Sequence, residues 1–365
     1  MKILQVNSAR NWRGGEQQLA YLLEGLPTHS VDTHVACREG SDLLKYCQQR
    51  GVAYTTLPFR GSWDRTTFRG LQTLLRKENF DLIHLHTASA HSQTVLAHTR
   101  LRSRIPLVLS RRILTPLRSR WFSRWKYNYP GIVRYLAVSD AIRRGMESYL
   151  KRPERILTVH SGVDPARFAT PPPHTWLHER FAIPKRTPLI GNASALEASK
   201  DYHTFLETAA QLHRQGLDAH YILLGEGPQR SLLKQRAETL GLAEQVHFTG
   251  YLHQLDTILP ELDVLLMPSR EEGLGTAILD AYAARVPVVA TRTGGIPEMV
   301  RHEHTGLLAD VGQPKQLAQQ VMRILGDQDF ADQLRNGGWQ QLTEHFSHER
   351  MIQKTLQVYR EALDG

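Results

Sequence analysis

The sequence predicts an α/β protein built from two doubly wound halves, each a parallel sheet covered by helices on both faces. Short apolar runs alternate with amphipathic stretches along the chain, as expected for parallel strands connected by helices. The alternation stops at residues 169–173, where three consecutive prolines exclude a strand or helix interior, and then starts again. We therefore expect a first domain over residues 1–168, a second over 169–347, and a final helix over 348–365 that packs back on the first domain.

The expected strands are runs of leucine and β-branched residues, and helical periodicity fills most of the gaps, as in residues 17–26 and 70–77. Ligands of doubly wound folds bind beyond the carboxyl ends of the strands, so we expect a ligand cleft shared by the two halves. The strand candidates are 3–6, 33–37, 82–85, 107–109, 135–138 and 156–159 in the first half, and 189–190, 221–224, 246–248, 264–267 and 288–290 in the second.

Composition and segment lengths indicate a cytoplasmic protein. The N-terminal apolar run, residues 3–6, is too short for a signal peptide, and no stretch approaches the ~20 apolar residues of a membrane span. The two cysteines, Cys37 and Cys47, have no metal-ligand spacing, and so few thiols suit a reducing compartment. Basic residues predominate between Arg100 and Arg155, an excess that attracts nucleic acid, anionic lipid or a phosphorylated substrate unless it is only a solvated face.

Residues 263–281 carry the strongest chemical signal. A buried strand is followed by a glycine-bearing loop and then by a helix that starts near Thr276. Free backbone N–H groups and the helix dipole favour a diphosphate at that start, and Gly273 and Gly275 let a ligand approach the backbone closely.

Two acids of this segment are placed to bind the sugars of such a ligand. Asp280 lies one turn into the helix, where a carboxylate can reach a ribose diol, and Glu272, just before the glycines, lies at the sugar end. The alternative is an ordinary strand–turn–helix connection in which both acids are incidental.

This segment resembles the E-x7-E signature of family 4 retaining glycosyltransferases, which have the GT-B fold of two Rossmann-like domains facing a cleft. Other segments resemble the family in the same order, so the resemblance spans nearly the whole chain, although each segment alone is weak. They are the glycine-rich loop 13–17, the strand 81–86 that ends in a histidine, the acceptor-domain segments 137–139 and 161–168, the turn 223–228 beside the nucleobase, and the loop 294–298.

The resemblance implies roles for the matching residues. Glu272, Lys200 and His86 would be catalytic: Glu272 engages hydroxyls of the transferred sugar, Lys200 the diphosphate, and His86 a donor hydroxyl, with a purely structural histidine as the equal alternative. Catalysis would rest on stabilising the leaving group, because no second carboxylate is positioned for a double displacement. The donor-binding residues would be Gly14, Gly15, Asn192, Gly225, Gly227, Gly273, Gly275, Thr276, Ala277 and Asp280.

Three departures from the family pattern affect this site. Asp280 stands where the family has its second glutamate and is one methylene shorter, so a ribose contact must be closer or water-mediated. Ala195 stands where an arginine would face the diphosphate, so one positive charge on the leaving group is missing. Arg111 and Arg112 follow the strand 107–109 in place of a frequent histidine, and they are candidates to bind an anionic acceptor or to supply the missing charge.

We therefore expect transfer of a hexose from a UDP- or GDP-linked sugar to a hydroxyl of a cell-surface glycan or lipopolysaccharide-type acceptor, with retention of anomeric configuration. The nucleotide sugar is a co-substrate, and neither a cofactor nor a metal is expected. The alternatives are a GT-B nucleotide-sugar epimerase and a catalytically inactive GT-B binding subunit, which Ala195 and Asp280 would suit. Nucleic acid is not an expected partner, because no nucleic-acid-binding motif accompanies the basic region.

Residues 115–129 are predicted to form a basic amphipathic helix. Thr115 is a suitable N-cap, Pro116 is tolerated in the first turn, and Trp121 and Trp125 share an apolar face. Such a helix suits a membrane interface and equally suits packing on its own sheet. Because a lipid-linked or lipopolysaccharide acceptor is expected, we favour peripheral binding to the anionic inner face of the plasma membrane.

Overall fold

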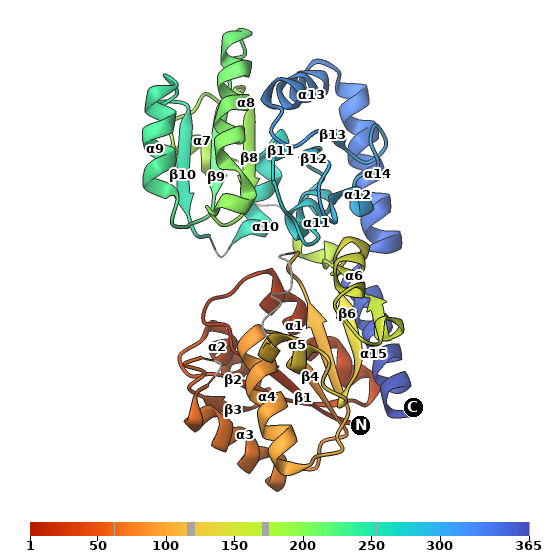
Figure 1. Ribbon diagram of the computed structural model, residues 1–365. Helices are drawn as coiled ribbons and strands as arrows, with labels where there is room; N and C mark the ends of the chain where they lie inside the picture. Colours follow the sequence, from red (N-terminus) through yellow and green to blue (C-terminus); the bar gives the residue numbers. More distant parts are fainter. Residues whose placement is uncertain (62, 115–120, 170–174, 253, 365) are drawn as a thin grey trace. The chain divides into compact units, whose positions relative to one another are not determined.

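The computed structural model describes residues 1–61, 63–114, 121–169, 175–252 and 254–364, which form two α/β units (Figure 1). The first unit comprises Met1–Ser161 together with the chain from His348 onward, and the second comprises Gly162–Ser347. Every pair of neighbouring strands in both sheets is parallel, and helices connect the strands. The predicted fold class, two doubly wound α/β domains, is confirmed.

Within its described residues, the first unit contains a seven-stranded sheet in the order β3-β2-β1-β4-β5-β6-β7. The order reverses between β1 and β4, so the carboxyl ends of these strands border the crevice in which doubly wound folds bind ligands. Its strands are β1 Lys2–Asn7, β2 Asp32–Arg38, β3 Ala53–Leu57, β4 Leu82–Leu85, β5 Leu107–Arg111, β6 Ile132–Ala137 and β7 Ile156–Thr158. Its helices are α1 Gly14–Gly25, α2 Asp42–Arg50, α3 Arg65–Lys77, α4 Ala88–Leu101, α5 Trp121–Tyr127, α6 Asp140–Glu147 and α15 His348–Asp364, with short 3-10 turns at Leu26–His29 and Pro153–Arg155.

The second unit contains, in the part that the structure describes, a six-stranded sheet in the order β10-β9-β8-β11-β12-β13. Here the order reverses between β8 and β11, which places the loops that follow these two strands side by side. Its strands are β8 Leu189–Ala193, β9 His220–Leu224, β10 Val246–Gly250, β11 Val264–Met267, β12 Val288–Thr291 and β13 Leu307–Ala309. Its helices are α7 Trp176–Arg180, α8 Tyr202–Arg214, α9 Arg230–Thr239, α10 Leu255–Ile258, α11 Thr276–Ala283, α12 Ile296–Met299, α13 Pro314–Gly326 and α14 Gln328–His345, with 3-10 turns at Pro165–Phe168, Ala198–Lys200 and Leu259–Glu261.

The boundary between the units differs from the expected one. It follows Ser161, so residues 162–168, expected at the end of the first domain, belong to the second unit. The reason is local pairing: the amide of Val163 donates to the carbonyl of Phe346 (3.0 Å), and the turn Pro165–Phe168 packs on α11. The proline-rich stretch on which the boundary was placed lies outside the described residues from Thr170 onward.

Two edge strands, β3 and β13, were missed in the prediction, and one predicted helix has different bounds. β3 is mostly polar and exposed and so forms no apolar run, whereas β13 is apolar but has only three residues, too few to stand out in the sequence. The predicted helix 115–129 is helical over Trp121–Tyr127, and its residues 115–120 lie outside the described residues. Its aromatic face is not packed on the sheet: Trp121 is exposed, whereas Lys126 is buried.

The final helix, α15, belongs to the first unit. It lies along α1 and β6 (Figure 1) and buries Ile352, Leu356 and Tyr359 in a core shared with Ile3 and Leu22. The Tyr359 hydroxyl bonds the side chains of His84 and Gln5 in the sheet. The C-terminal segment is therefore part of the first unit's core, because its apolar face has no other cover.

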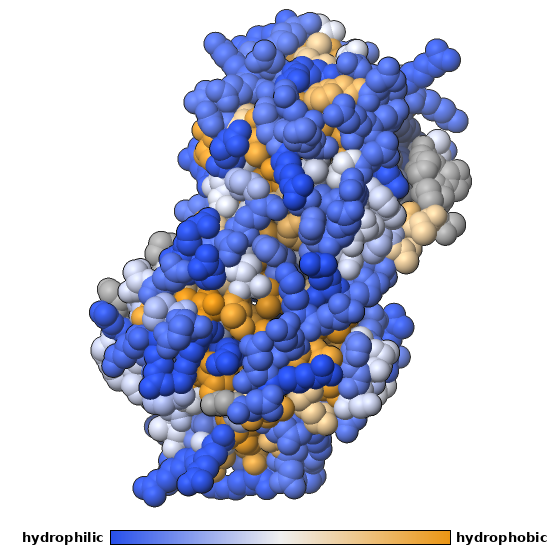
Figure 2. Space-filling model, turned by 90° about the vertical axis from the view of Figure 1, so that its right-hand side faces the viewer, coloured by the Kyte–Doolittle hydropathy of each residue, from blue (hydrophilic) through white to orange (hydrophobic). Residues whose placement is uncertain are grey.

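None of the helices in the described ranges combines the length and hydropathy needed to cross a membrane. The face of the molecule shown in Figure 2 is mainly hydrophilic, and hydrophobic residues are visible on it in patches between polar ones.

Replacing Gly337 by alanine is expected to destabilise the second unit. Gly337 lies inside α14, where alanine would normally be favoured by about 1 kcal/mol, but a Cβ at this position would overlap the backbone carbonyl oxygen of His304. Gly326, at the end of α13, has nothing within 4 Å of the same added atom and provides the matched control. Urea unfolding should show a loss of about 1–3 kcal/mol for Gly337→Ala and none for Gly326→Ala; equal stability of the two variants would contradict this packing.

Candidate active site

The connection between β11 and α11 leaves backbone amides unpaired at a helix start. Gly275 is the N-cap of α11 and has φ +98°, in the left-handed region that favours glycine. The amide of Ile278 bonds to the carbonyl of Gly275 (2.9 Å), so the amides of Thr276 and Ala277 precede the first bond of the helix. These two N–H groups, with the helix dipole, can bind an anion.

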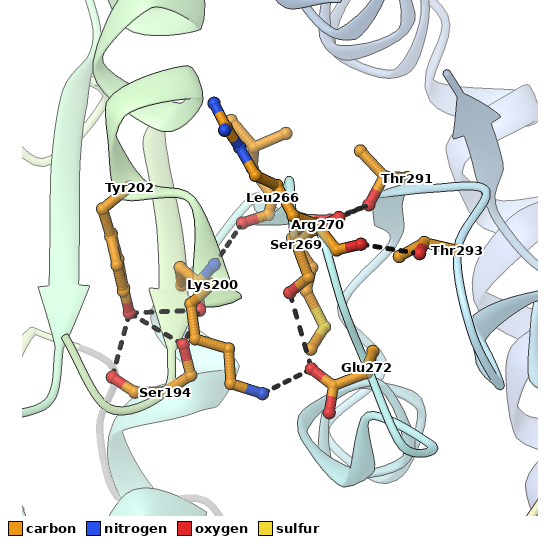
Figure 3. A network of polar contacts seen from close by, with 11 residues as sticks. Ser194, Lys200, Tyr202, Leu266, Ser269, Arg270, Glu272, Thr291 and Thr293 are labelled. Atoms are coloured by element: carbon orange, nitrogen blue, oxygen red, sulfur yellow. Dashed lines mark hydrogen bonds and ion pairs between the residues drawn. The ribbon is translucent and has the colours of Figure 1, made fainter. Parts of the chain in front are cut away.

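Two charged side chains that the sequence analysis singled out meet beside this helix start. The ammonium of Lys200 and a carboxylate oxygen of Glu272 form an ion pair and hydrogen bond, and the Ser269 hydroxyl lies 3.4 Å from the same oxygen (Figure 3). The pair is largely buried, with side-chain exposures of 19% for Lys200 and 10% for Glu272. A buried charge needs such a partner, so each of these residues holds the other in place.

Backbone contacts from two neighbouring loops fix the segment that carries Glu272. The amide of Arg270 donates to the carbonyl of Ser199 (2.9 Å), in the loop after β8 that also carries Lys200. The hydroxyl of Thr291 donates to the carbonyl of Ser269 (2.6 Å), and that of Thr293 to the carbonyl of Arg270 (2.8 Å) (Figure 3). The loop is thus held from both sides. No motif in the sequence indicated a role for its partners, Ser199, Thr291 and Thr293.

A glycine pair lies directly against the backbone of Glu272. Gly294 has φ +52°, and a Cβ there would overlap the carbonyl oxygen of Glu272. The amide of Gly295 donates to that same oxygen (3.2 Å). The loop after β12 therefore supports Glu272 from behind, and only glycine allows the approach.

A salt bridge outside the predicted set completes this support. The Arg270 guanidinium, which is mostly exposed, donates to the buried carboxylate of Asp201 (2.7 Å), the N-cap of α8. Arg270 lies in the segment 263–281, but the resemblance assigns no role to it, and the only sequence signal of Asp201 is an aspartate before a helix.

Asn192, predicted to bind the donor, serves the scaffold in this structure. Its side-chain amide donates to the carbonyl of Leu266 (2.9 Å), and its oxygen accepts from the hydroxyls of Ser194 (2.9 Å) and Tyr202 (3.3 Å). Asn192 is buried, and these bonds tie β8 to β11 at the point where the strand order reverses.

Gly225 and Gly227 lie where the turn after β9 meets the loop after β8. A Cβ on Gly225 would overlap the carbonyl of Ser194, and one on Gly227 would contact the backbone of Leu196 at 2.6–2.8 Å. The two backbones also bond directly, because the amide of Leu196 donates to the carbonyl of Glu226 (3.1 Å). These glycines allow the two loops to pack closely together. Their predicted place beside the nucleobase remains a prediction.

Asp280 lies one turn into α11 and is partly buried. Burial raises the pKa of its carboxyl to about 6, the nearby charge of Arg167 opposes this shift, and Asp256 adds to it. Arg167, on the 3-10 turn that packs against α11, was not predicted as a site residue. A carboxyl with this pKa is mostly ionised at neutral pH and can accept hydrogen bonds from hydroxyls.

His86, at the carboxyl end of β4 in the first unit, is buried and neutral. Its Nε2 lies 2.8 Å from the side-chain oxygen of Gln5, and its Nδ1 has no hydrogen-bond partner among the described residues. Burial, together with the charges of His84 and Arg112, holds the pKa of His86 well below its usual range. An uncharged ring with one unpaired nitrogen can bond a substrate hydroxyl, so the structure is compatible with either interpretation made from the sequence.

His84, predicted to be scaffold, is fully engaged. Its Nδ1 lies 2.6 Å from the Tyr359 hydroxyl and its Nε2 lies 2.8 Å from the Ser110 hydroxyl. Gln5 donates to the same Tyr359 hydroxyl (3.2 Å), so a hydrogen-bonded chain runs from His84 through Tyr359 and Gln5 to His86. Tyr359 was missed because it lies on the largely apolar buried face of α15, where an aromatic side chain is expected to pack in the core.

The glycine-rich loop after β1 starts α1 beside an arginine. α1 begins at Gly14, and a Cβ on Gly15 would lie 3.4 Å from the side chain of Arg112. Arg112 donates to the Ser161 hydroxyl (3.4 Å), and burial lowers its pKa to about 10, an effect that the carboxylate of Glu16 opposes. The structure therefore places a partly buried cation against the predicted glycine loop.

Arg111, the other candidate for acceptor binding, turns to different partners. It donates to the hydroxyl of Tyr127 (2.9 Å) in α5, whereas Arg112 bonds Ser161. The two adjacent arginines thus bond different parts of the first unit, as expected for consecutive residues of an extended segment, whose side chains point in opposite directions.

The predicted site residues fall into two groups, one in each unit. The second unit brings together Lys200, Glu272 and the start of α11, and the first brings together His86, Arg112 and the start of α1. Among the described residues, no three His, Cys, Asp or Glu side chains gather as a set of metal ligands.

Comparison with known proteins identifies the family. The family model "Glycosyltransferase Family 4" matches residues 12–167, and the model "Glycosyl transferases group 1" matches residues 176–341. The chain is a family 4 glycosyltransferase. The N-acetyl-alpha-D-glucosaminyl L-malate synthase of Bacillus anthracis is 26% identical to it over 295 residues, 79% of this chain and 76% of the relative. The lipopolysaccharide core biosynthesis glycosyltransferase LpsE of Rhizobium meliloti is 30% identical over 179 residues, 49% of this chain and 52% of the relative.

Solved structures confirm the GT-B fold of this glycosyltransferase. The Anabaena protein HepE, in complex with UDP and glucose, matches with a TM-score of 0.86 at 20% identity, over 99% of this chain and 100% of that one. The prediction of a GT-B glycosyltransferase from the residue motifs is therefore confirmed in family, fold and class of enzyme.

Asp280→Asn is expected to stabilise the glycosyltransferase above pH 6. The folded-state pKa of about 6 lies above the ordinary value of 3.8. Ionisation therefore opposes folding, and this cost grows as the pH rises from about 4 to about 6 and stays constant above. Urea unfolding at pH 4 and pH 8 should show that the advantage of Asp280→Asn over the wild type increases by about 1–3 kcal/mol. The exposed Asp310→Asn is the control, and a pH-independent difference for Asp280→Asn would contradict the shifted pKa.

Proposed function

We propose that this glycosyltransferase moves a hexose from a UDP- or GDP-linked sugar to a hydroxyl of a cell-surface glycan or lipopolysaccharide-type acceptor, with retention of configuration. The observation that carries the proposal is the buried Lys200–Glu272 pair beside the unpaired amides of α11. The relative LpsE, named for lipopolysaccharide core biosynthesis, and HepE, solved with UDP and glucose, support this choice of acceptor and donor.

The diphosphate of the donor would lie at the start of α11. The amides of Thr276 and Ala277 and the positive end of the helix favour the negative charge that develops on the leaving nucleoside diphosphate. Lys200 adds a cation, because an ammonium has three N–H donors and Glu272 uses one of them. Stabilising this leaving group is the main catalytic resource, and Lys200 carries more of it because Ala195 supplies no charge.

Glu272 and Asp280 would orient the two sugars of the donor. The second oxygen of the Glu272 carboxylate is available to hydroxyls of the hexose, while the first is held by Lys200 and Ser269. Asp280, largely ionised at neutral pH, would accept from the ribose hydroxyls.

His86 would contribute from the first unit. Its neutral ring is held by Gln5 and leaves Nδ1 for a substrate hydroxyl. Gly15 and Arg112 would add a backbone amide and a positive charge to the binding of anionic substrate groups.

Glu272→Gln and Lys200→Met are each expected to lower transfer by at least about 100-fold, because each removes a charge that the transition state uses. The exposed neighbour Glu271→Gln is the control and should retain wild-type turnover. Donors are first selected by thermal shift with nucleotide sugars, and products are then measured by mass spectrometry as nucleoside diphosphate released and hexose gained. Wild-type turnover in either site variant would reject this assignment, and an isomerised nucleotide sugar without acceptor gain would reject transfer.

We also propose that the enzyme binds the anionic inner face of the plasma membrane through α5. Trp121 (77% exposed) and Trp125 (37%) present an aromatic face, and Trp63 (66%), from the loop after β3, packs against Phe122 with the ring centroids 4.6 Å apart and the planes tilted by 36°. Exposed tryptophans beside basic residues are typical of interfacial helices.

The double variant Trp63→Ser/Trp121→Ser is expected to lose binding to phosphatidylglycerol vesicles, measured by co-sedimentation, by about 10-fold, because two aromatic anchors are removed. Leu232→Ser, which removes an exposed apolar side chain (50%) from α9, should bind as the wild type does. Equal binding of the double variant and the wild type would reject α5 as the anchor.

A further inference from the structure

A group of basic side chains lies in the first unit, apart from the residues assigned to the donor. Lys126, in α5, is buried (9% exposed), and its ammonium donates to the Ser92 hydroxyl of α4 (2.8 Å). It also lies 5.5 Å from the ring centroid of Tyr127, whose hydroxyl accepts from Arg111. His91 packs edge-on against the same ring, with centroids 4.7 Å apart. Three nitrogen-bearing side chains thus surround one tyrosine.

The positive charge of Lys126 is not balanced by a carboxylate. Its contacts in the described part of the chain are the Ser92 hydroxyl and the Tyr127 ring, and neither is an anion. Burial and the charge of Arg111 lower the pKa of Lys126 to about 8, and burial with both of these charges lowers the pKa of His91 to about 3. Burying a cation without a counter-charge is unfavourable, so this arrangement is unusual for a lysine with a purely structural role.

Polar atoms without partners gather on the adjacent helix. Of the buried side-chain atoms that lack a hydrogen bond in the described ranges, four belong to the first seven residues of α4: Ser89 Oγ, His91 Nδ1, Gln93 Oε1 and Thr94 Oγ1. His91, Gln93 and Thr94 are completely buried. Two of them, the hydroxyls of Ser89 and Thr94, can donate to an anion and so mark a place where a ligand would complete the bonding. The other two, Gln93 Oε1 and His91 Nδ1, are acceptors, because His91 Nε2 donates to the carbonyl of Lys126 (3.0 Å), and they take no part in binding an anion.

The fold places this group where the first sheet binds ligands. Arg111 is the last residue of β5, and α4 follows β4, so both lie at the carboxyl ends of neighbouring strands. The hydroxyl of the N-cap, Thr87, is engaged by Ser8 and does not cap the first amides of α4. His86 lies at the same end of the same strand.

We propose that Lys126, Arg111 and the start of α4 form an anion site that binds a phosphate group of the acceptor. The inference rests on the proposed function, in which the first unit receives the acceptor. A phosphate suits these groups, because it accepts from an ammonium, from the planar fork of an arginine and from hydroxyls at once. The phosphate could be carried by a sugar of the glycan or by a lipid headgroup, and the chemistry recognised is the same.

The test uses the full chain with its donor site saturated by UDP or GDP, whichever the wild type binds, so that added inorganic phosphate does not compete there. At constant ionic strength, phosphate should raise the melting temperature of the wild type. Lys126→Met should weaken the apparent phosphate affinity by about 10-fold or more. Arg124→Gln removes an exposed charge from the same helix and should change it by less than about 2-fold.

Stability without phosphate provides a second readout. If Lys126 holds an uncompensated charge for a ligand, Lys126→Met should melt a few degrees higher than the wild type. A structural lysine would give the opposite sign, and loss of folding in both Lys126→Met and Lys126→Gln would overturn the proposal. An unchanged phosphate response in Lys126→Met would also overturn it, as would the absence of any response in the wild type.

UDP binding is measured on the same variants and should remain unchanged. Failure of the wild type to bind either UDP or GDP would reject the proposed function but not the phosphate site, so the two failures are distinguishable. Glucose 6-phosphate and phosphatidylglycerol vesicles then separate the two sources: a Lys126-dependent response to either supports the site and names the carrier, and a response to neither overturns the acceptor role.

Discussion

Lys200 and Glu272 come from loops that follow different strands of the second sheet, and their charges are buried against each other. Breaking such a pair leaves an uncompensated buried charge, which typically costs about 3–5 kcal/mol. The surrounding loops must therefore hold both residues at contact distance. They do so with backbone bonds from Ser199 and Gly295 and with two threonine hydroxyls, one at the end of β12 and one in the loop after it.

The same constraint explains the glycines around the site. Gly294 must be glycine because the chain passes against the carbonyl of Glu272, and Gly275 because the turn into α11 requires a positive φ. Together they leave the first amides of α11 without internal partners and next to a lysine. A site built for an anionic leaving group thus results from the packing that protects one ion pair.

The first unit contains one group of buried polar side chains that is almost fully hydrogen-bonded and another in which several atoms have no partner among the described residues. In the chain from His84 through Tyr359 and Gln5 to His86, nearly every polar atom has a partner, and only His86 Nδ1 is left. Around Lys126 two hydroxyls of α4, those of Ser89 and Thr94, lack partners in the described part of the chain, and the charges have one sign. The first arrangement fixes a residue in place, and the second needs a ligand of opposite charge to be complete.

The sequence by itself determined the class of fold, most strands, the family and the segments that form the donor site. Buried strands are continuous apolar runs, and glycine and acidic positions around residues 272–280 are constrained locally by the turn that they form. The exposed edge strand β3 and the three-residue β13 gave no such local signal. Only the tertiary structure decided which residues meet. Asn192 ties two strands together, and Asp201 binds Arg270. Arg111 and Arg112 bond different partners, and Lys126 is buried while Trp121 is exposed. These outcomes depend on contacts between residues far apart in the chain, and the pattern of neighbouring residues carries no information about them.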